Sequence, residues 1–207
     1  MPRALLIVDK LKDFGPGGSL AVAGSEKCVP LINALQVEGG YDVIVLIQDW
    51  HPANHRSFAS NNPGVATLSL FRLGGKPQVA WPDHCVQGTD GADFVDGLIT
   101  HLAAIVIRKG MNPDVDSYSG FYDNDGTGTG LTGFLRDRGI TAIDVVGDAT
   151  DYCDKFTALD GVQDGFDVRL VADCCAAVNV TPGDGDKAIA EMQEAGVAIV
   201  TSEQVLA

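Results

Sequence analysis

Six short runs of β-branched and aliphatic residues recur along the chain, with helical patterns between them. The runs cover residues 3–9, 41–49, 103–109, 142–147, 166–173 and 197–202. They are apolar at nearly every position rather than at alternate ones, so they predict strands buried on both faces, as parallel sheets require. The segments between them follow a helical period, and several end at glycine. These predicted helices cover residues 25–37, 93–102, 131–139, 151–163 and 185–196.

The alternation of these two patterns predicts an α/β fold. Units of strand, helix and strand build a parallel sheet with helices on both faces. We therefore expect a three-layer α/β/α sandwich of the Rossmann-like type, with a six-stranded, mainly parallel sheet in a single domain over residues 1–207. Two long stretches rich in Pro, Gly, Asn and Asp interrupt the pattern at about 52–92 and 110–128. Because loops of that length are usually functional, we expect both to border an active site.

Composition narrows the class of partner. The chain has 207 residues, of which 45% are apolar, and this suits one globular domain with a full core. A net charge of -14 disfavours nucleic acid and anionic membranes, so we expect a small neutral molecule, a cation or a metal as partner. No apolar stretch approaches the ~20 residues of a membrane span and no secretory signal is evident, which predicts a cytoplasmic protein. Five cysteines without a C-x-x-C pair predict reduced thiols.

Reactive side chains follow four of the predicted strands. Asp9 ends the first strand, Asp49 and His51 follow the second, Lys109 ends the third, and Cys153 comes one short turn after the fourth. The carboxyl ends of parallel strands meet at one edge of the sheet, where open α/β sheets bind their ligands. The five residues therefore predict one active site at this edge.

Three side chains suit a metal ion. Asp49 and His51 are two positions apart on an extended segment, so both leave the same face and can share one cation. His84 in the first long loop is the third candidate ligand and His55 a fourth, whereas His101 fits packing or the surface. Two imidazoles and a carboxylate suit one divalent transition metal, namely Zn²⁺, Fe²⁺ or Mn²⁺, with water at the open positions.

Cys153 is the candidate nucleophile. A cysteine in the first turn of a helix faces unpaired backbone N–H groups and the positive end of the helix dipole, which lower the thiol pKa. The same N–H groups can stabilise an oxyanion when a thiolate attacks a carbonyl. Asp9 would accept the thiol proton, and the Lys109 ammonium would stabilise negative charge. Cys85 would line a pocket beside His84. A buried cysteine is otherwise a small apolar filler, the role that we expect of Cys28, Cys174 and Cys175.

Several stretches of the chain resemble one known family. They are "LLIVD", "QDWHPANHRSF", "WPDHCVQGTDGADF", "DSYSGFYDNDG" and "GDATDYCDKFTALD". They span nearly the whole chain and look like the nicotinamidase/pyrazinamidase branch of the isochorismatase-like hydrolases. The resemblance implies a catalytic triad, a set of metal ligands and a wall for the pyridine ring. Carried over position by position, these are Asp9, Lys109 and Cys153 for the triad, Asp49, His51 and His84 for the metal, and Phe14, Trp81 and Tyr118 for the ring.

The resemblance also implies a reaction. Members of this branch hydrolyse nicotinamide, and often pyrazinamide, to the acid and ammonia through a cysteine thioester, with one divalent transition metal that orients the pyridine nitrogen. The backbone N–H groups of Ala149 and Cys153 would hold the oxyanion, and the Asp148–Ala149 peptide would be cis. The resemblance further implies the strand order 321456. Assembly into dimers or tetramers is common in the family.

Two stretches depart from the family pattern close to the expected chemistry. An acid beside Cys153 would disfavour its thiolate, and buried charges are unfavourable unless they are paired. Because the first and fourth strands are neighbours in the expected order, we predict that Lys10 or Lys12 pairs with Asp148 or Asp154. The full set of departures is Lys10, Leu11, Lys12 and Gly15 after the first strand, and Asp148 and Asp154 around the nucleophile.

Three other functions share part of this pattern. A related amide or ureido hydrolase would share the triad but usually lacks the aspartate and two-histidine metal set. A ligand-binding protein with an amidase-like fold and an altered, weakly active or inactive site would fit the acids at Asp148 and Asp154. A flavodoxin-like nucleotide-binding domain is disfavoured, because no phosphate-binding glycine-rich loop follows the first strand.

Overall fold

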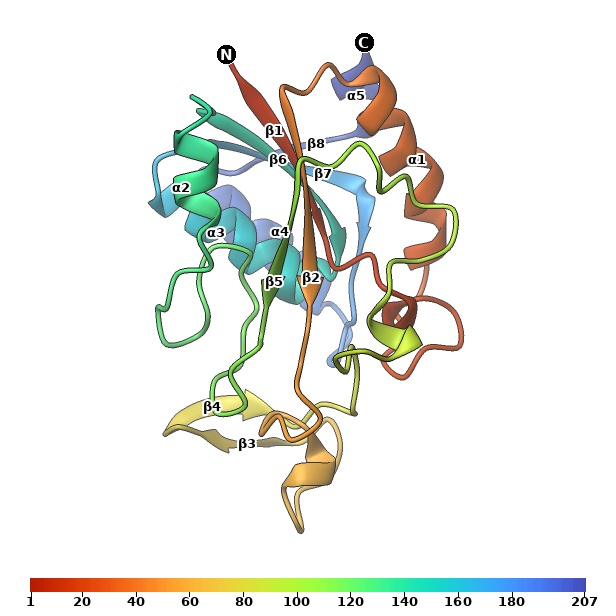
Figure 1. Ribbon diagram of the computed structural model, residues 1–207, viewed down its shortest axis with the longest axis vertical. Helices are drawn as coiled ribbons and strands as arrows, with labels where there is room; N and C mark the ends of the chain where they lie inside the picture. The colour runs from red at the N-terminus through yellow and green to blue at the C-terminus, as the bar shows by residue number, and fades with distance from the viewer.

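A six-stranded sheet forms the centre of the molecule (Figure 1). The computed structural model of the chain describes all 207 residues. Every neighbouring pair of strands in this sheet is parallel. The result confirms the strand order that the family implied and all six predicted strands. Across the sheet, these are β5 (Ile105–Lys109), β2 (Val43–Asp49), β1 (Arg3–Val8), β6 (Ala142–Asp148), β7 (Asp167–Ala176) and β8 (Ala198–Val200).

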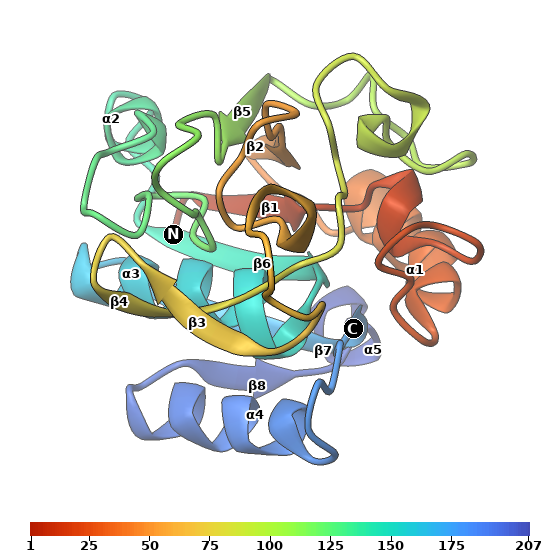
Figure 2. The same ribbon diagram turned by 90° about the horizontal axis from the view of Figure 1, so that it is seen from below.

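Helices cover both faces of the sheet and complete the three layers of an α/β/α sandwich (Figures 1 and 2). One face carries α1 (Ser25–Glu38) and α5 (Ser202–Leu206). The other face carries α2 (Leu131–Arg136), α3 (Lys155–Gln163) and α4 (Asp184–Glu194). None of these helices is both long enough and apolar enough to cross a membrane.

The central strands supply both hydrophobic cores. β2 is buried at every position, and β1 is buried from Ala4 onward, as continuous apolar runs require when helices cover both faces. Successive side chains of β1 point to opposite faces, so Leu6 packs in the core beneath α2, α3 and α4 while Leu5 and Ile7 pack against α1. This burial holds the ends of the central strands in fixed positions at the sheet edge.

The first long loop contains a β-hairpin that the sequence patterns did not predict. Its strands are β3 (Leu70–Leu73) and β4 (Lys76–Val79), joined by Gly74 and Gly75. Both glycines have positive φ, 56° and 82°, which a two-residue hairpin turn of this kind requires. The hairpin lies beyond the carboxyl ends of the sheet strands, at the end of the molecule opposite the two termini (Figure 1). It therefore forms a cover over the edge where the reactive side chains meet.

The helix predicted over residues 93–102 is wrong, because this segment consists of turns. Its backbone makes two hydrogen bonds with the segment after β1: the Val95 N–H donates to the Lys10 carbonyl at 3.0 Å, and the Lys12 N–H donates to the Asp93 carbonyl at 2.9 Å. Gly97 then takes a left-handed φ of 85°, which breaks any helical turn. The apolar residues of the pattern are used in packing against the α1 side of the core.

Candidate active site

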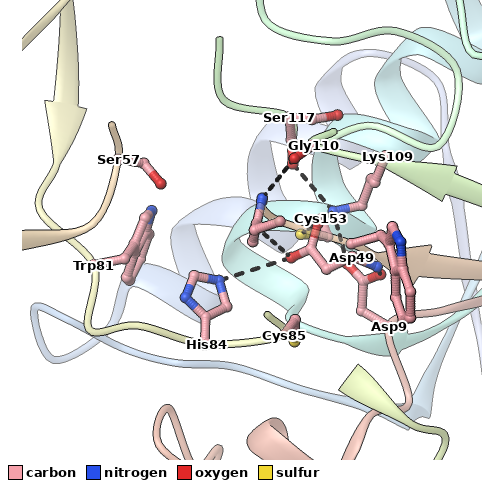
Figure 3. A network of polar contacts seen from close by, with 12 residues as sticks. Asp9, Asp49, Ser57, Trp81, His84, Cys85, Lys109, Gly110, Ser117 and Cys153 are labelled. Carbon is pink, nitrogen blue, oxygen red and sulfur yellow. Dashed lines mark hydrogen bonds and ion pairs between the residues drawn. The ribbon is translucent and has the colours of Figure 1, made fainter. Parts of the chain in front are cut away.

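The reactive side chains predicted at the sheet edge meet there (Figure 3). Asp9 directly follows β1, Asp49 and Lys109 are the last residues of β2 and β5, and His51 follows β2 by two residues. Cys153 lies in a π-helical turn, Thr150–Asp154, which connects β6 to α3. All of these side chains are buried. The prediction that they form one site at the carboxyl ends of the strands agrees with this geometry.

The Lys109 ammonium lies at the centre of the group. Its Nζ is 2.9 Å from Asp9 Oδ2 and 3.4 Å from Cys153 Sγ. It also donates to Asp49 Oδ1 and, at 3.1 Å, to the Ser117 carbonyl. The Asp9 carboxylate and the Cys153 thiol have ligand atoms within 4.8 Å of each other. One cation therefore joins the candidate base, the candidate nucleophile and a candidate metal ligand.

The acid–base properties of Asp9 and Cys153 follow from their burial. Burial and the charge of Asp49 raise the pKa of Asp9 to about 7, although Lys109 opposes the shift. Burial also raises the pKa of the Cys153 thiol well above its usual value, against the influence of Lys109. The prediction that the helix start lowers this pKa is wrong, because loss of solvation outweighs the helix dipole. The raised pKa favours the thiol form of the sulfur, and the Asp9 carboxylate is close enough to receive its proton.

Asp49, His51 and His84 converge on one point beside Lys109. His51 Nε2 and His84 Nε2 lie 3.4 Å and 3.8 Å from Asp49 Oδ2. The Nδ1 atoms of the two rings lie 2.9 Å from the Gly110 carbonyl and 2.8 Å from the Pro82 carbonyl, respectively. A carbonyl can only accept, so each Nδ1 carries a proton, and Nε2 is the ring nitrogen that a metal ion can use in the neutral ring. This donor set fits a divalent transition metal.

Electrostatics agree with that donor set. Burial and the neighbouring His51 lower the pKa of His84 to about 4, which keeps the ring neutral, as metal ligation requires. Burial would raise the pKa of Asp49, but Lys109 and His51 outweigh it, and the pKa lies below its usual value. Burial would likewise lower the pKa of His51, but Asp49 outweighs it and raises that pKa. Because Asp49 favours a positive charge on the His51 ring, a metal ion bound here would compete with a proton for His51 Nε2.

His55, the fourth candidate ligand, is engaged elsewhere. Its Nδ1 lies 2.7 Å from Ser57 Oγ and its Nε2 lies 3.2 Å from the Val115 carbonyl, so both ring nitrogens already have partners. The ring packs against His51, with the ring centroids 4.4 Å apart. His55 therefore supports the position of His51, and its role as a fourth ligand stays a prediction. His101 is exposed in a turn, as expected of a surface residue.

A small cavity connects Cys153 to Asp49, His51 and His84, the three side chains that we call the candidate metal cluster. Its wall includes Phe14, Trp81 and Tyr118, the three residues expected around a pyridine ring. The Trp81 indole N–H donates to the Tyr118 hydroxyl at 3.2 Å. The Phe14 ring lies 5.6 Å from the His84 ring, measured between centroids. The cavity therefore offers aromatic side walls, with the candidate ligands and the thiol both lining it.

Sequence reasoning missed other residues of this cavity. Tyr152 packs edge-on against Trp81, with ring centroids 4.9 Å apart. Its place directly before Cys153 was an available signal, because neighbours of a nucleophile within one tight turn often share its pocket. The remaining members come from irregular segments, where no period marks the buried side chains. The missed residues are Leu20, Asp116, Ser117, Tyr152 and Val178.

The turn after β6 presents backbone donors to the cavity. The Ala149 carbonyl accepts from the Tyr152 N–H at 2.9 Å and from the Asp154 N–H at 3.1 Å, which closes the turn. No hydrogen bond within the chain uses the Ala149 N–H, and Ala149 and Cys153 both line the cavity. The Asp148–Ala149 peptide is cis, as the family resemblance implied.

The unusual charges near the site are only partly paired. Lys10 Nζ lies 2.8 Å from Asp148 Oδ2 with both side chains fully buried, which confirms one predicted pair. Lys12, the other lysine considered for such a pair, lies 2.6 Å from Asp90 instead. Neither carboxyl oxygen of Asp154 has a hydrogen-bond partner, and burial together with Asp148 raises its pKa well above the usual value. A carboxyl with a raised pKa is ionised less readily, so it opposes a neighbouring thiolate less than an ordinary aspartate would.

The other cysteines take structural positions, and none forms a disulfide. Cys85 is completely buried in the core on the α1 side and does not line the cavity, which corrects its predicted place. Its backbone N–H donates to Asp13 Oδ2 at 2.7 Å, and this bond turns the side chain inward. Cys28 and Cys174 are buried and Cys175 is half-buried, in agreement with the filler role.

Comparison with known proteins gives the family that the resemblance indicated. The Isochorismatase domain model matches residues 3–204. A curated nicotinamidase of Escherichia coli (strain K12) is 46% identical over 205 residues, which cover 97% of this chain and 95% of the relative. A solved Acinetobacter baumanii nicotinamidase/pyrazinamidase has a TM-score of 0.94 at 44% identity and covers 99% of this chain and 98% of its own. A solved pyrazinamidase of Pyrococcus horikoshii in complex with zinc has a TM-score of 0.78 at 38% identity, with 97% and 99% covered. The chain therefore belongs to the isochorismatase family.

Proposed function

We propose that this protein hydrolyses nicotinamide, and also pyrazinamide, to the carboxylate and ammonia through a thioester on Cys153. The contact of one Lys109 ammonium with Asp9, at 2.9 Å, and with the Cys153 sulfur, at 3.4 Å, carries the proposal. It brings a proton acceptor, a nucleophile and a stabilising cation together, with Cys153 lining an aromatic cavity. The names of the full-length relatives at 46% and 44% identity support the same substrates.

Acylation would begin with proton transfer from the Cys153 thiol to Asp9. Asp9 Oδ2 has no hydrogen-bond partner besides its ion contact with Lys109, so it keeps a lone pair for this proton. The thiolate then bonds to the carboxamide carbon, and the backbone N–H groups of Ala149 and Cys153 hold the resulting oxyanion. As the C=O bond re-forms, the C–N bond breaks. Asp9 gives its proton to the departing nitrogen, which leaves as ammonia.

Deacylation would use the same groups in reverse order. Asp9, ionised again, takes a proton from water while the water oxygen bonds to the thioester carbon. The C–S bond then breaks, and the Cys153 sulfur recovers a proton from Asp9. Burial would lower the pKa of Lys109, but Asp49 and Asp9 outweigh it and raise that pKa well above its usual value. Lys109 therefore stays an ammonium and stabilises each anionic state in turn.

Substrate orientation would depend on the aromatic walls and the metal cluster. Phe14, Trp81 and Tyr118 can hold a planar ring by stacking and edge contacts. Asp49, His51 and His84 would hold one divalent transition metal, which when bound supplies a Lewis-acid contact for the ring nitrogen. The zinc-bound relative from Pyrococcus horikoshii supports a metal at this place. A ring held at both sides would present its carboxamide to Cys153 in a fixed direction.

The test is ammonia release from nicotinamide by the purified protein, measured beside Cys153→Ala and Cys28→Ala. Cys28 is a buried cysteine outside the cavity, so its variant controls for the loss of a thiol. We expect turnover in the wild type and in Cys28→Ala and none in Cys153→Ala. A wild-type protein that binds nicotinamide without releasing ammonia would instead establish a ligand-binding protein of amidase fold. Turnover of a ureido substrate without turnover of nicotinamide would assign the related hydrolase activity.

A further inference from the structure

A buried polar cluster lies behind the active site, between the ends of β1 and β6. It consists of Lys10, Ser25 and Asp148, and we refer to it as the Lys10 cluster. Lys10 Nζ donates to Asp148 Oδ2 at 2.8 Å, to the Ser25 carbonyl at 2.8 Å and to Ser25 Oγ at 2.6 Å. Ser25 Oγ donates in turn to Asp148 Oδ2 at 2.6 Å. All three ammonium hydrogens are therefore used, in a closed triangle without contact with solvent.

Each member of the Lys10 cluster occupies a joint between elements. Lys10 directly follows Asp9, Asp148 directly precedes Ala149, and Ser25 begins α1. The parallel ladder between β1 and β6 runs to Val8 opposite Gly147 and stops there. Beyond that point, the ion pair of Lys10 and Asp148 links the two strand ends directly. The cluster thus ties the segment that carries Asp9 to the segment that carries the Ala149–Cys153 turn.

The backbone at Asp9 needs such a restraint. Asp9 adopts a left-handed conformation with φ of 47°, which a residue with a side chain holds only when its surroundings fix it. On one side, its N–H donates to the Ile47 carbonyl at 3.1 Å. On the other side, the next side chain is the anchored Lys10. Together with the hydrogen bond from the Leu11 N–H to the Asp9 carbonyl at 2.7 Å, this anchor restrains the backbone directly after Asp9.

We propose that the Lys10 cluster is a positioning element, which fixes the end of β1 against the end of β6 and thereby fixes Asp9 relative to Cys153 and Ala149. The inference rests on the proposed function, because it takes Asp9 as the proton acceptor and Cys153 as the nucleophile. A buried ion pair contributes little net stability compared with apolar packing, but its hydrogen bonds are directional. Direction matters here, because a displacement of ~1 Å at reacting groups can lower a rate by ~100-fold.

Two variants loosen the cluster to different degrees. Asp148→Asn keeps an acceptor oxygen but removes the charge opposite Lys10. Ser25→Ala removes the hydroxyl corner of the triangle with its two hydrogen bonds, but leaves the ion pair in place, so it should fold even if the first variant is unstable. Asp144→Asn is the matched control: Asp144 is also buried on β6 but lies toward its amino end, where it accepts from Arg3 at 2.6 Å and from Arg169 at 2.7 Å.

The experiment measures kcat and KM for nicotinamide, and the rate of Cys153 alkylation by iodoacetamide, at a temperature where every variant is folded. We expect kcat to fall roughly 10- to 100-fold in Asp148→Asn and several-fold in Ser25→Ala, with KM changed by less than about twofold. Alkylation of Cys153 should slow in the same order. Asp144→Asn should lower the melting temperature but leave kcat and alkylation unchanged.

Several results would overturn the inference. Wild-type values of kcat and alkylation in both cluster variants would show that the cluster only stabilises the fold. Equal losses in Asp144→Asn would show a general effect of disturbing β6. Absence of turnover in the wild-type protein would overturn the proposed function. The rate of Cys153 alkylation would then test the positioning role by itself, and an unchanged rate in both cluster variants would overturn that role as well.

Discussion

Lys109 Nζ lies 2.9 Å from Asp9 Oδ2, with both side chains completely enclosed by the protein. The same nitrogen donates to Asp49 and lies 3.4 Å from the Cys153 sulfur. The candidate triad and the candidate metal cluster therefore share one cation and are not independent sites. Two carboxylates that share one ammonium cannot both be fully stabilised as anions, which is why burial and Asp49 together raise the pKa of Asp9 to about 7.

Replacement of Lys109 by Gln should damage both stability and turnover. The variant leaves two buried carboxylates without their cation, and the loss of one member of such a group lowers the free energy of unfolding by about 3–5 kcal/mol. Turnover should fall by roughly 10²-fold or more, because Asp9 would then hold its proton too tightly to act as a base. Urea unfolding and ammonia release measure the two effects.

The control variant is Lys155→Gln. Lys155 pairs with the exposed Glu191, so its loss should change the free energy of unfolding by less than about 1 kcal/mol. Equal behaviour of the two variants would contradict the central place of Lys109.

The metal cluster predicts the metal content of the purified protein. We expect about one divalent transition-metal ion per chain, bound at least tenfold more weakly in His84→Ala, because an imidazole ligand is lost from a set of three. Elemental analysis after dialysis against a weak chelator measures the content. His101→Ala should retain the metal, since His101 is exposed in a turn and is not one of the candidate ligands. Full turnover by a chelated protein that contains no metal would show that the cluster does not take part in the reaction.

The unpaired Asp154 predicts a pH-dependent gain in stability on its removal. Burial and Asp148 raise its pKa in the folded chain, so the folded state favours the protonated carboxyl. In the unfolded chain the group ionises near pH ~3.9, and from there upward stability falls with pH until the folded pKa is passed. Asp154→Asn cannot ionise, so the variant should be more stable than the wild type at about pH 8 and similar to it at about pH 4. Urea midpoints across this range test the prediction.

The control variant is Asp186→Asn, at an exposed acid on α4, and it should show no such trend. A gain that is the same at both pH values would refute the origin in ionisation.

The Lys10–Asp148 pair predicts strong coupling in a double-mutant cycle. Lys10→Met alone leaves Asp148 buried without its cation and should lower the free energy of unfolding by about 3–5 kcal/mol. Addition of Asp148→Leu removes the orphaned charge, so the double variant should recover most of that loss. Denaturant melts of the four proteins give the coupling energy. Purely additive changes would show that the two side chains, 2.8 Å apart, do not stabilise each other.

The sequence predicted best the strands whose apolar residues are continuous, because burial on both faces alone explains that pattern. The continuous apolar runs of β1 and β2 can be buried only between two layers of helices. The positions of these strands, and the sheet edge that holds Asp9 and Asp49, could therefore be predicted from the sequence. The ligand set and the ring walls came from motifs rather than from periodicity. The helix predicted over 93–102 failed because its backbone bonds to the segment after β1, a tertiary choice that no local period reveals. The β3–β4 hairpin has a local signal in the Gly74–Gly75 pair, but its strands are short, and β4 is too polar for an apolar run to mark it.

Buried electrostatics were the least predictable part of the site. Opposite charges after two neighbouring strands were enough to predict that Lys10 or Lys12 pairs with Asp148 or Asp154. Which residues pair depends on the fold, because Lys10 reaches Asp148 in the interior while Lys12 lies beside Asp90. The raised pKa of Cys153 depends on how completely the turn is enclosed, and burial of this kind belongs to the whole fold rather than to the sequence near the thiol.

A covalent intermediate is the central claim, and acid quenching during turnover tests it most directly. Protein is mixed with excess nicotinamide, quenched with acid at short times and digested. Mass spectrometry then gives the mass of the peptide that contains Cys153, and ammonia and nicotinate are measured in the same samples. We expect a nicotinoyl group on Cys153 and release of ammonia ahead of nicotinate, because C–N cleavage precedes thioester hydrolysis. Steady turnover with no acyl group on Cys153, undiminished in Cys153→Ala, would contradict the thioester mechanism.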